Sequence, residues 1–198
     1  SDFSPKVSAR YNPIDALVLR ASWGKGFRAP SLPDLTQQPA ESADSVSDYL
    51  TCAAIGEAAG CSSQINATVI SNPDLQSEQS EQMSLGIVYQ ATDNIDFELD
   101  YYDIEITNRI RAFGSQYIID ATLRGDSLPP AFTVTRAPNG GITNVVRGFG
   151  NDGTLETSGL DFKARSSFDF GDAGRLTTNL NISHILDYST DGGRNFVK

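Results

Sequence analysis

Three acidic residues at alternate positions, Asp96, Glu98 and Asp100, form the pattern in the chain that most directly suggests chemistry. Alternate positions of a strand share one face, about 7 Å apart, so these carboxylates could act as the paired acids of glycoside hydrolysis. The basic residues Lys163 and Arg165 alternate in a later segment. If the short turns are level, Asp100 is expected near Arg165, and opposite charges across strands stabilise a sheet. We favour this structural interpretation over a catalytic one.

Other residues that could carry chemistry lack the partners that the chemistry needs. Cys52 and Cys61 are the two cysteines, and so close a pair favours a loop disulfide in an oxidising compartment, with two unpaired thiols as the alternative. His184 is the one histidine, so a zinc site of about four ligands is not expected. An Arg-Gly-Asp tripeptide begins at Arg124, and matches of three residues arise easily by chance. We predict no catalytic residue, metal site or cofactor, and the ligand-binding residues stay unidentified.

The composition limits the classes of partner. The chain has 198 residues and a formal net charge of −10, whereas nucleic-acid binding needs a basic surface, so no nucleic-acid partner is expected. No apolar run approaches the roughly 18 residues of a membrane-spanning helix. This excludes helical spans, while β-strands that cross a membrane give a much weaker sequence signal.

The elements that position these residues are predicted from apolar side chains at every second position. This alternation predicts an all-β chain with about six strands, at residues 3–12, 15–27, 80–90, 95–108, 154–170 and 175–187. In the segment 95–108, the apolar residues move from odd-numbered to even-numbered positions near Tyr101–Asp103. Such a change indicates either a β-bulge or a strand that has left the bilayer.

The connections between these strands alternate between short and long. Short, turn-like joins rich in Gly, Pro, Asn and Asp lie at residues 12–15, 91–94 and 171–174. Long outer loops are expected at about residues 28–78 and 111–150. Long loops are uncommon in compact domains, but alternating short and long connections are typical of a transmembrane β-barrel. A soluble sandwich with its apolar faces packed inward remains the alternative.

Two motifs bracket the first long loop, and together they closely resemble the signature of the TonB-dependent outer-membrane receptors. The residues of the two motifs are Gly26, Phe27, Arg28, Ala29, Pro30 and Ser31, then Asn72, Pro73, Leu75 and Glu78. Gly159–Phe162, which follows Asn151 and Gly153, is a third and weaker match.

The resemblance implies a fold and a role for the chain. It implies that residues 1–198 are an arc of antiparallel up-and-down strands from the C-terminal half of a 22-stranded transmembrane β-barrel. By the same resemblance, the plug domain of the family is expected to be absent from this sequence, and Val197–Lys198 lacks the terminal aromatic residue expected of a finished barrel. The implied setting is the outer membrane of a Gram-negative bacterium, with membrane lipid as one partner.

The same resemblance implies uptake of an iron–siderophore, a cobalamin or an oligosaccharide. The energy would come from the TonB complex through the missing plug. Within this arrangement, the loops around Cys52–Cys61 and 124–144 are expected to help gate or contact the small-molecule nutrient. The alternative function is a soluble extracellular β-sandwich or adhesin-like binding module, and an enzyme is not expected.

Overall fold

The computed structural model describes residues 3–190 and 194–195, so the C-terminal pair Val197–Lys198 lies outside the described residues. The chain forms two compact units, and we describe each by itself. Unit 1 comprises Ser1–Arg28, Glu78–Arg109 and Gly153–Lys198, and unit 2 comprises Ala29–Ser77 and Ile110–Asp152. Among the described residues, no helix is long and apolar enough to cross a membrane.

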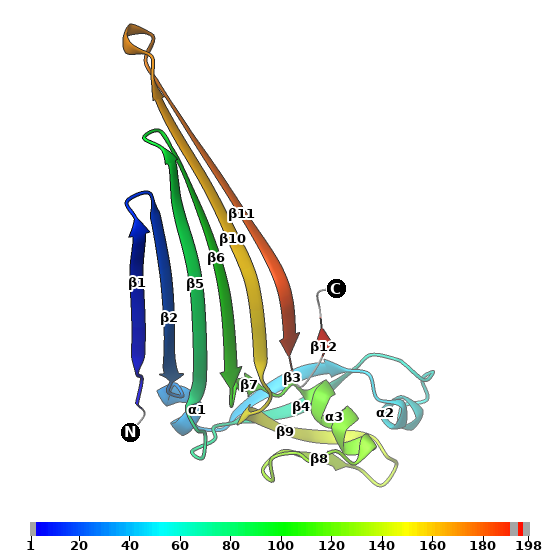
Figure 1. The fold of residues 1–198 in the computed structure, drawn as a ribbon. Coiled ribbons are helices and arrows are strands. Elements are labelled where there is room, and N and C mark those ends of the chain that lie inside the picture. Colours follow the sequence, from blue (N-terminus) through cyan, green and yellow to red (C-terminus); the bar gives the residue numbers. More distant parts are fainter. Residues whose placement is uncertain (1–2, 191–193, 196–198) are drawn as a thin grey trace. The chain divides into compact units, whose positions relative to one another are not determined.

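Unit 1 is a single antiparallel sheet in which strands pair in their order along the unit (Figure 1). Six long strands confirm the predicted arc, and a two-residue strand follows them. The strands are β1 (Lys6–Ile14), β2 (Leu17–Arg28), β5 (Glu78–Thr92), β6 (Ile95–Thr107), β10 (Leu155–Asp169), β11 (Arg175–Thr190) and β12 (Arg194–Asn195). A short 3-10 helix, η1 (Gly171–Ala173), lies in the turn between β10 and β11.

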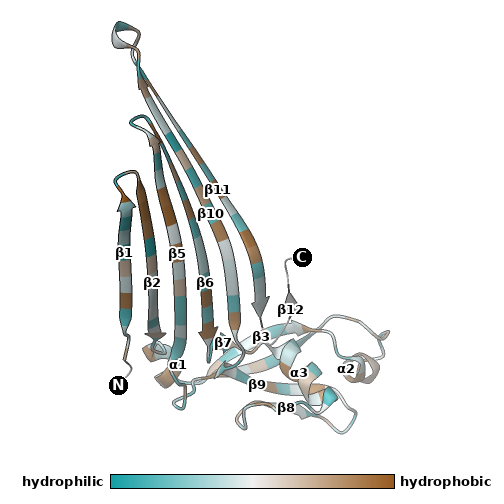
Figure 2. Ribbon diagram, in the orientation of Figure 1, coloured by the Kyte–Doolittle hydropathy of each residue, from teal (hydrophilic) through white to brown (hydrophobic). Residues whose placement is uncertain are grey.

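One face of this sheet is apolar because the register brings the predicted apolar positions side by side. One such row runs across five strands through Leu19, Ile87, Leu99, Phe162 and Ile182. Leu19 is 37% exposed and Ile182 is 50% exposed. Along each strand, apolar and polar residues alternate (Figure 2). A sandwich layer would bury these side chains, so their exposure argues against the soluble-sandwich alternative.

Of the two explanations offered for the change of parity near Tyr101–Asp103, the β-bulge is not observed. β6 pairs with β5 and with β10 in an unbroken register through this region. Asp103 and Glu105 therefore continue the face that carries Leu99, and this face changes from apolar to acidic along β6. The apolar residues therefore change position because the chemistry of the two sheet faces changes along β6, while the backbone stays regular.

Unit 2 contains elements that the alternation analysis did not assign. The sheet order is β3-β4-β9-β7, with β8 also paired to β9, and the β4–β9 pair is parallel. These strands are β3 (Ala40–Val46), β4 (Ser63–Ile70), β7 (Ile110–Ala112), β8 (Thr133–Arg136) and β9 (Ile142–Asn151). The helices are α1 (Leu32–Thr36), α2 (Tyr49–Ala54) and α3 (Ser115–Arg124). The two segments expected as long loops thus pair with each other inside one folded unit.

All of the buried apolar side chains among the described residues belong to unit 2. Ile118 and Ile119 of α3 and Val145 of β9 are fully buried. They join a cluster that includes Ile65 and Phe132. The helix α3 ends at Arg124, and the left-handed backbone of the following Gly125 (φ 76°) is accessible to glycine at little cost. Unit 2 therefore has its own hydrophobic core.

Candidate functional site

The two motifs of the sequence analysis meet at the strand ends where the chain leaves and re-enters unit 1. Arg28, the last residue of β2, lies in register with Glu78, the first residue of β5. The Arg28 Nε and Nη2 atoms donate to the two Glu78 carboxylate oxygens at 2.7 and 2.6 Å. Such a bidentate pair fixes geometry as well as adding energy. The pair therefore joins the two residues that flank the segment 29–77.

The remaining motif residues have structural contacts. Gly26 lies opposite Ser80, whose Oγ would be 2.8 Å from a Cβ at this position. Ser31 caps α1 by accepting a hydrogen bond from the Asp34 backbone N–H. Phe27 is 45% exposed at the end of β2. Ala29 and Pro30 connect β2 to Ser31.

The second motif stabilises the return of the chain towards β5. The Asn72 side chain donates to the Phe149 carbonyl oxygen at 3.0 Å and accepts from the Asp74 backbone N–H. This is the local turn that Asn commonly forms, and Pro73 sits within it. Leu75 is buried at 8% exposure. The motif residues therefore organise the chain at the two ends of the segment 29–77.

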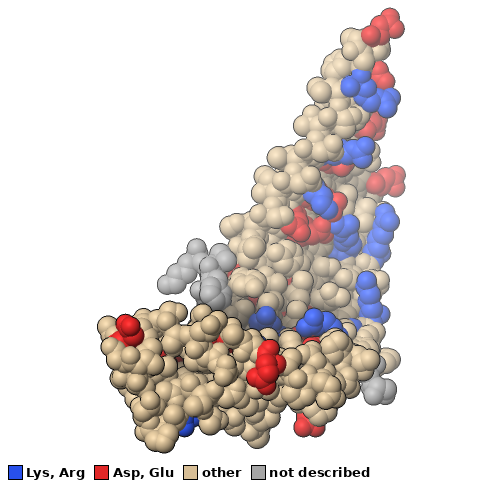
Figure 3. Space-filling view, turned by 180° about the vertical axis from the view of Figure 1, so that it is seen from behind, with Lys and Arg blue, Asp and Glu red and all other residues tan. Residues whose placement is uncertain are grey.

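The acidic pattern of β6 is part of a four-residue ion-pair network on the polar face of unit 1. The Arg20 guanidinium binds both carboxylate oxygens of Asp100, at 3.0 and 2.6 Å, and also contacts Glu98. Lys163 Nζ lies 2.9 Å from the same Glu98 oxygen, Oε1. Two cations thus neutralise two carboxylates, which favours the structural interpretation of this pattern. Basic and acidic side chains are interspersed along the sheet in Figure 3.

A glycine makes this network possible. Arg20 and Asp100 lie on β2 and β6, which are separated by β5 and therefore by about 10 Å. Gly86 of β5 occupies the position between them in the same row. A Cβ there would overlap the Asp100 carboxylate and the Arg20 side chain. The missing side chain lets Arg20 extend across the intervening strand.

The predicted pairing of Asp100 with Arg165 is wrong. Arg165 lies opposite Asp96, and Asp100 lies opposite Asp161. The prediction assumed that the short turns are level, but Ile95 at the start of β6 pairs with Ser166, before the end of β10. The β10–β11 hairpin therefore extends past the β5–β6 turn (Figure 1).

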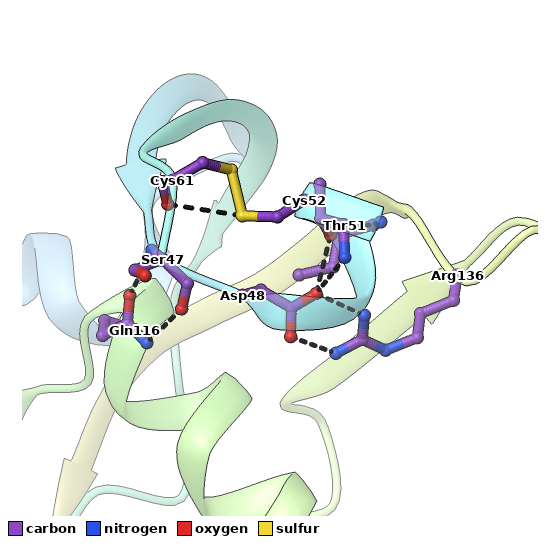
Figure 4. Close-up of a disulfide and its surroundings, with 8 residues drawn as sticks. Ser47, Asp48, Thr51, Cys52, Cys61, Gln116 and Arg136 are labelled. Carbon is purple, nitrogen blue, oxygen red and sulfur yellow. Dashed lines mark hydrogen bonds and ion pairs between the residues drawn. A yellow bond between two sulfur atoms is a disulfide. The ribbon is translucent and has the colours of Figure 1, made fainter. Parts of the chain in front are cut away.

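In unit 2, the expected disulfide between Cys52 and Cys61 forms next to a buried ion pair (Figure 4). Asp48 caps α2 by accepting hydrogen bonds from the Thr51 N–H and hydroxyl. The Arg136 guanidinium donates to both Asp48 oxygens at 2.7 and 2.9 Å. These hydrogen bonds from Arg136 lower the pKa of Asp48 from 3.8 to about 2. Asp48 is fully buried as a side chain, so Arg136 is its essential counterion.

A second ion pair joins three elements of unit 2. The Asp44 carboxylate of β3 accepts from Ser115 Oγ at 2.6 Å and from Ser42 Oγ at 2.7 Å. Arg147 of β9 lies 2.8 Å from the same carboxylate. Burial raises the pKa of Asp44, but these hydrogen bonds outweigh it and the net pKa is lowered. Sequence reasoning missed both ion pairs because their partners are about 90 to 100 residues apart.

No group of three or more His, Cys, Asp or Glu side chains in the described part of the chain could hold a metal ion. Within the Arg-Gly-Asp tripeptide, Arg124 Nε donates to Asp126 at 2.8 Å, so the two charges pair with each other.

Comparison with known proteins gives a consistent match. The family described as "TonB dependent receptor-like, beta-barrel" matches residues 1–197. No curated protein matches the chain. Among solved structures, the siderophore receptor PirA from Acinetobacter baumannii has a TM-score of 0.61 and 18% identity over 94% of this chain and 23% of its own.

Two further receptor structures are similar to the chain. A mutant of the ferric enterobactin receptor PfeA from Pseudomonas aeruginosa, solved with enterobactin, has a TM-score of 0.61 and 18% identity, covering 93% of this chain and 22% of its own. The hemophore receptor HasR from Serratia marcescens, in complex with HasA and heme, has a TM-score of 0.55 and 17% identity, covering 92% and 22%. The chain spans less than a quarter of these three proteins. At these identities the likeness establishes the fold.

Proposed function

The chain belongs to the TonB-dependent receptor β-barrel family, and from this premise we propose that it is part of an outer-membrane receptor for energy-coupled uptake of a scarce nutrient. Members of this family are transporters and not enzymes. The observation that carries the proposal is the exposed apolar face of unit 1. Leu85 and Leu180 on this face are 48% exposed, which suits side chains that contact lipid.

The polar face of the same sheet supports an orientation. A lipid-facing charge costs about 2–4 kcal/mol near the bilayer midplane. The network of Arg20, Glu98, Asp100 and Lys163 therefore faces the barrel lumen. The segments of unit 2 connect to the other ends of the strands from the short turns, so unit 2 belongs to the outer side.

The proposal names three partners. Outer-membrane lipid contacts the apolar face, and the TonB energy-coupling complex acts through a plug domain. The third partner is a small-molecule nutrient, namely an iron–siderophore, a cobalamin or an oligosaccharide. The similar structures named as siderophore receptors favour the first of these.

Protease accessibility in intact cells tests the orientation. A protease site placed in the exposed segment 58–60, next to Cys61, is expected to be cleaved in intact cells. A matched site in the Asp93–Asn94 turn is expected to be cleaved only after the outer membrane is lysed. Cleavage near Cys61 that requires lysis would contradict the orientation.

Uptake in cells tests the transport role. Cells lacking the gene that encodes this chain are expected to lose accumulation of one labelled nutrient among a ferric siderophore, cyanocobalamin and a maltooligosaccharide. Cells that keep the gene but lack the coupling complex are expected to bind this nutrient without accumulating it. Unchanged accumulation of all three nutrients in the gene deletion would refute the role.

A further inference from the structure

A groove of about 430 Å³ lies in unit 2, and its lining includes Thr51, the neighbour of Cys52 in the sequence. It is lined by the end of α2, the start of β4 and the turn between β8 and β9. Every lining side chain is uncharged. Ile55, which is 58% exposed, and Ile65 offer apolar contact, while Gln64 and Asn139 offer amides. An apolar surface with a few polar groups is the usual character of a small-molecule site.

Several polar groups at this groove have unused hydrogen-bonding capacity. The Ser63 hydroxyl oxygen is buried and has no hydrogen-bond partner among the described residues. The Asn139 Oδ1 atom accepts from the Gly141 N–H, which leaves the donors of the same amide available. A buried polar group without a partner is destabilising, and a ligand with matching polar groups would recover this loss.

The charges nearest the groove neutralise each other. Thr51 lines the groove, and its hydroxyl donates to Asp48. Asp48 is in turn paired with Arg136 through two hydrogen bonds. A charged ligand would meet no charged side chain in the lining of the groove, and an unpaired charge in a desolvated site is costly.

The other arginines of unit 2 are paired in the same way. Its segments 29–77 and 110–152 contain nine acidic residues, four arginines, and no lysine or histidine. Each arginine forms an ion pair with a carboxylate of the unit: Arg111 with Asp152, Arg124 with Asp126, Arg136 with Asp48, and Arg147 with Asp44. The surplus charge of unit 2 is therefore negative, and it repels anions.

We infer that this groove is a binding site for an uncharged, hydrogen-bonding organic ligand, and that unit 2 rejects polyanionic ligands. The inference rests on the proposed function because it specifies the nutrient class of the same receptor. Neutral ferric trihydroxamate chelates, cyanocobalamin and neutral oligosaccharides share the required chemistry. A ferric tris-catecholate, which carries three negative charges, does not.

Binding to the full-length receptor that carries this chain, purified in detergent, tests the inference by calorimetry. The four probes are a neutral ferric trihydroxamate, cyanocobalamin, maltohexaose and a ferric tris-catecholate. One uncharged probe is expected to bind, and the tris-catecholate is not. Ala54→Trp, which fills the groove, is expected to weaken this binding by more than about tenfold because the added ring occupies ligand space.

Two further variants keep the test decisive. Ala53 is the adjacent, exposed residue of α2 and does not line the groove, so Ala53→Trp is the matched control and should leave affinity unchanged. Gln64→Ala removes one exposed amide that makes no side-chain hydrogen bond within the described residues, and it should weaken binding by about fivefold. This variant gives an answer even if Ala54→Trp does not fold.

The possible outcomes separate the groove from the transport role. Binding of the tris-catecholate, failure of all uncharged probes to bind, or an unchanged affinity in both groove variants would overturn the inference. If uptake proceeds normally in Ala54→Trp cells, the groove is refuted while the transport role stands. If the groove variants lose binding but no energy-coupled uptake exists, the groove stands while the transport role is refuted.

Discussion

The two units of this chain place their apolar side chains in opposite ways. In unit 1, Leu85 and Ile87 are nearly half exposed on a sheet face. In unit 2, Ile118, Ile119 and Val145 are fully buried in a core of the unit's own. The hydrophobic effect acts on both sets of side chains. Unit 2 satisfies it by burying these side chains internally, whereas unit 1 leaves them exposed on one face of its sheet.

The ion pairs of the two units also differ in their exposure. The unit 1 network leaves Arg20 44% and Lys163 52% exposed as side chains, so their ion pairs remain open to water and ions. In unit 2 the Asp48 side chain is fully buried and depends on Arg136. Exposed ion pairs contribute about 0–1 kcal/mol, while a buried carboxylate that loses its partner is far more costly. Ion pairs between the same types of residue therefore differ in how much they contribute to stability.

The largest expected effect comes from breaking the buried pair. Arg136→Ala leaves the Asp48 carboxylate buried without a counterion and is expected to lower the free energy of unfolding of unit 2 by about 3–5 kcal/mol. Hydrogen exchange of the unit 2 amides measures this loss. Arg124→Ala, which breaks the exposed pair with Asp126, is the control and should cost less than about 1 kcal/mol. Equal losses would remove the contrast between buried and exposed pairs.

A charge on the apolar face of unit 1 tests the other side of the comparison. Leu85→Arg is expected to destabilise the protein in a lipid bilayer by about 2–4 kcal/mol because the guanidinium would face lipid. Gln82→Arg places the same charge on the polar face of the same strand and should be tolerated. Urea unfolding in vesicles measures both variants, and equal tolerance would show that this face does not contact lipid.

The disulfide is expected to matter only to unit 2. Replacing Cys52 and Cys61 together with Ser opens a loop of about ten residues and should lower the free energy of unfolding by about 2–3 kcal/mol. Hydrogen exchange should increase in unit 2 and remain unchanged in β5 and β6. Increased exchange in those strands would mean that the two units are not energetically separate.

Acid should weaken unit 2 reversibly. The pKa of Asp48 is about 2 in the folded protein and 3.8 in its ordinary state, so the folded state favours the carboxylate. The resulting stabilisation of about 2 kcal/mol is complete above about pH 4 and is lost as the pH falls towards 2. Unfolding of unit 2 measured across this range should show the loss. Arg136→Ala should lack it, and an identical pH profile in this variant would contradict the assignment.

Local pattern was sufficient to predict unit 1. Alternation within each segment, of which Ile95–Tyr101 is one example, and the Asn- and Gly-rich turns between segments predicted all six long strands. Their predicted ends lie within a few residues of the observed ones. A strand alternates its faces at every second residue whatever its neighbours are. The error concerned Asp100, whose neighbour depends on the relative heights of two hairpins. No property of either hairpin alone determines this height.

Unit 2 and the networks required the tertiary structure. The pairing of Ala67 with Val145, the contact of Asp48 with Arg136 and the passage of Arg20 over Gly86 all join residues far apart in the sequence. β4 does alternate buried Ile65 and Ala67 with exposed Gln64 and Asn66, but the alternation does not identify its distant partner β9.

The sequence by itself determined the strands of unit 1, their apolar face, the close cysteine pair and the resemblance to a receptor family. Only the tertiary structure decided the register, the core of unit 2, the buried ion pair and the uncharged groove. The physical reason is that alternation and turns are local properties of the chain. Register, core packing and ion pairing depend on which distant segments meet, and the meeting is decided by the free energy of the whole fold.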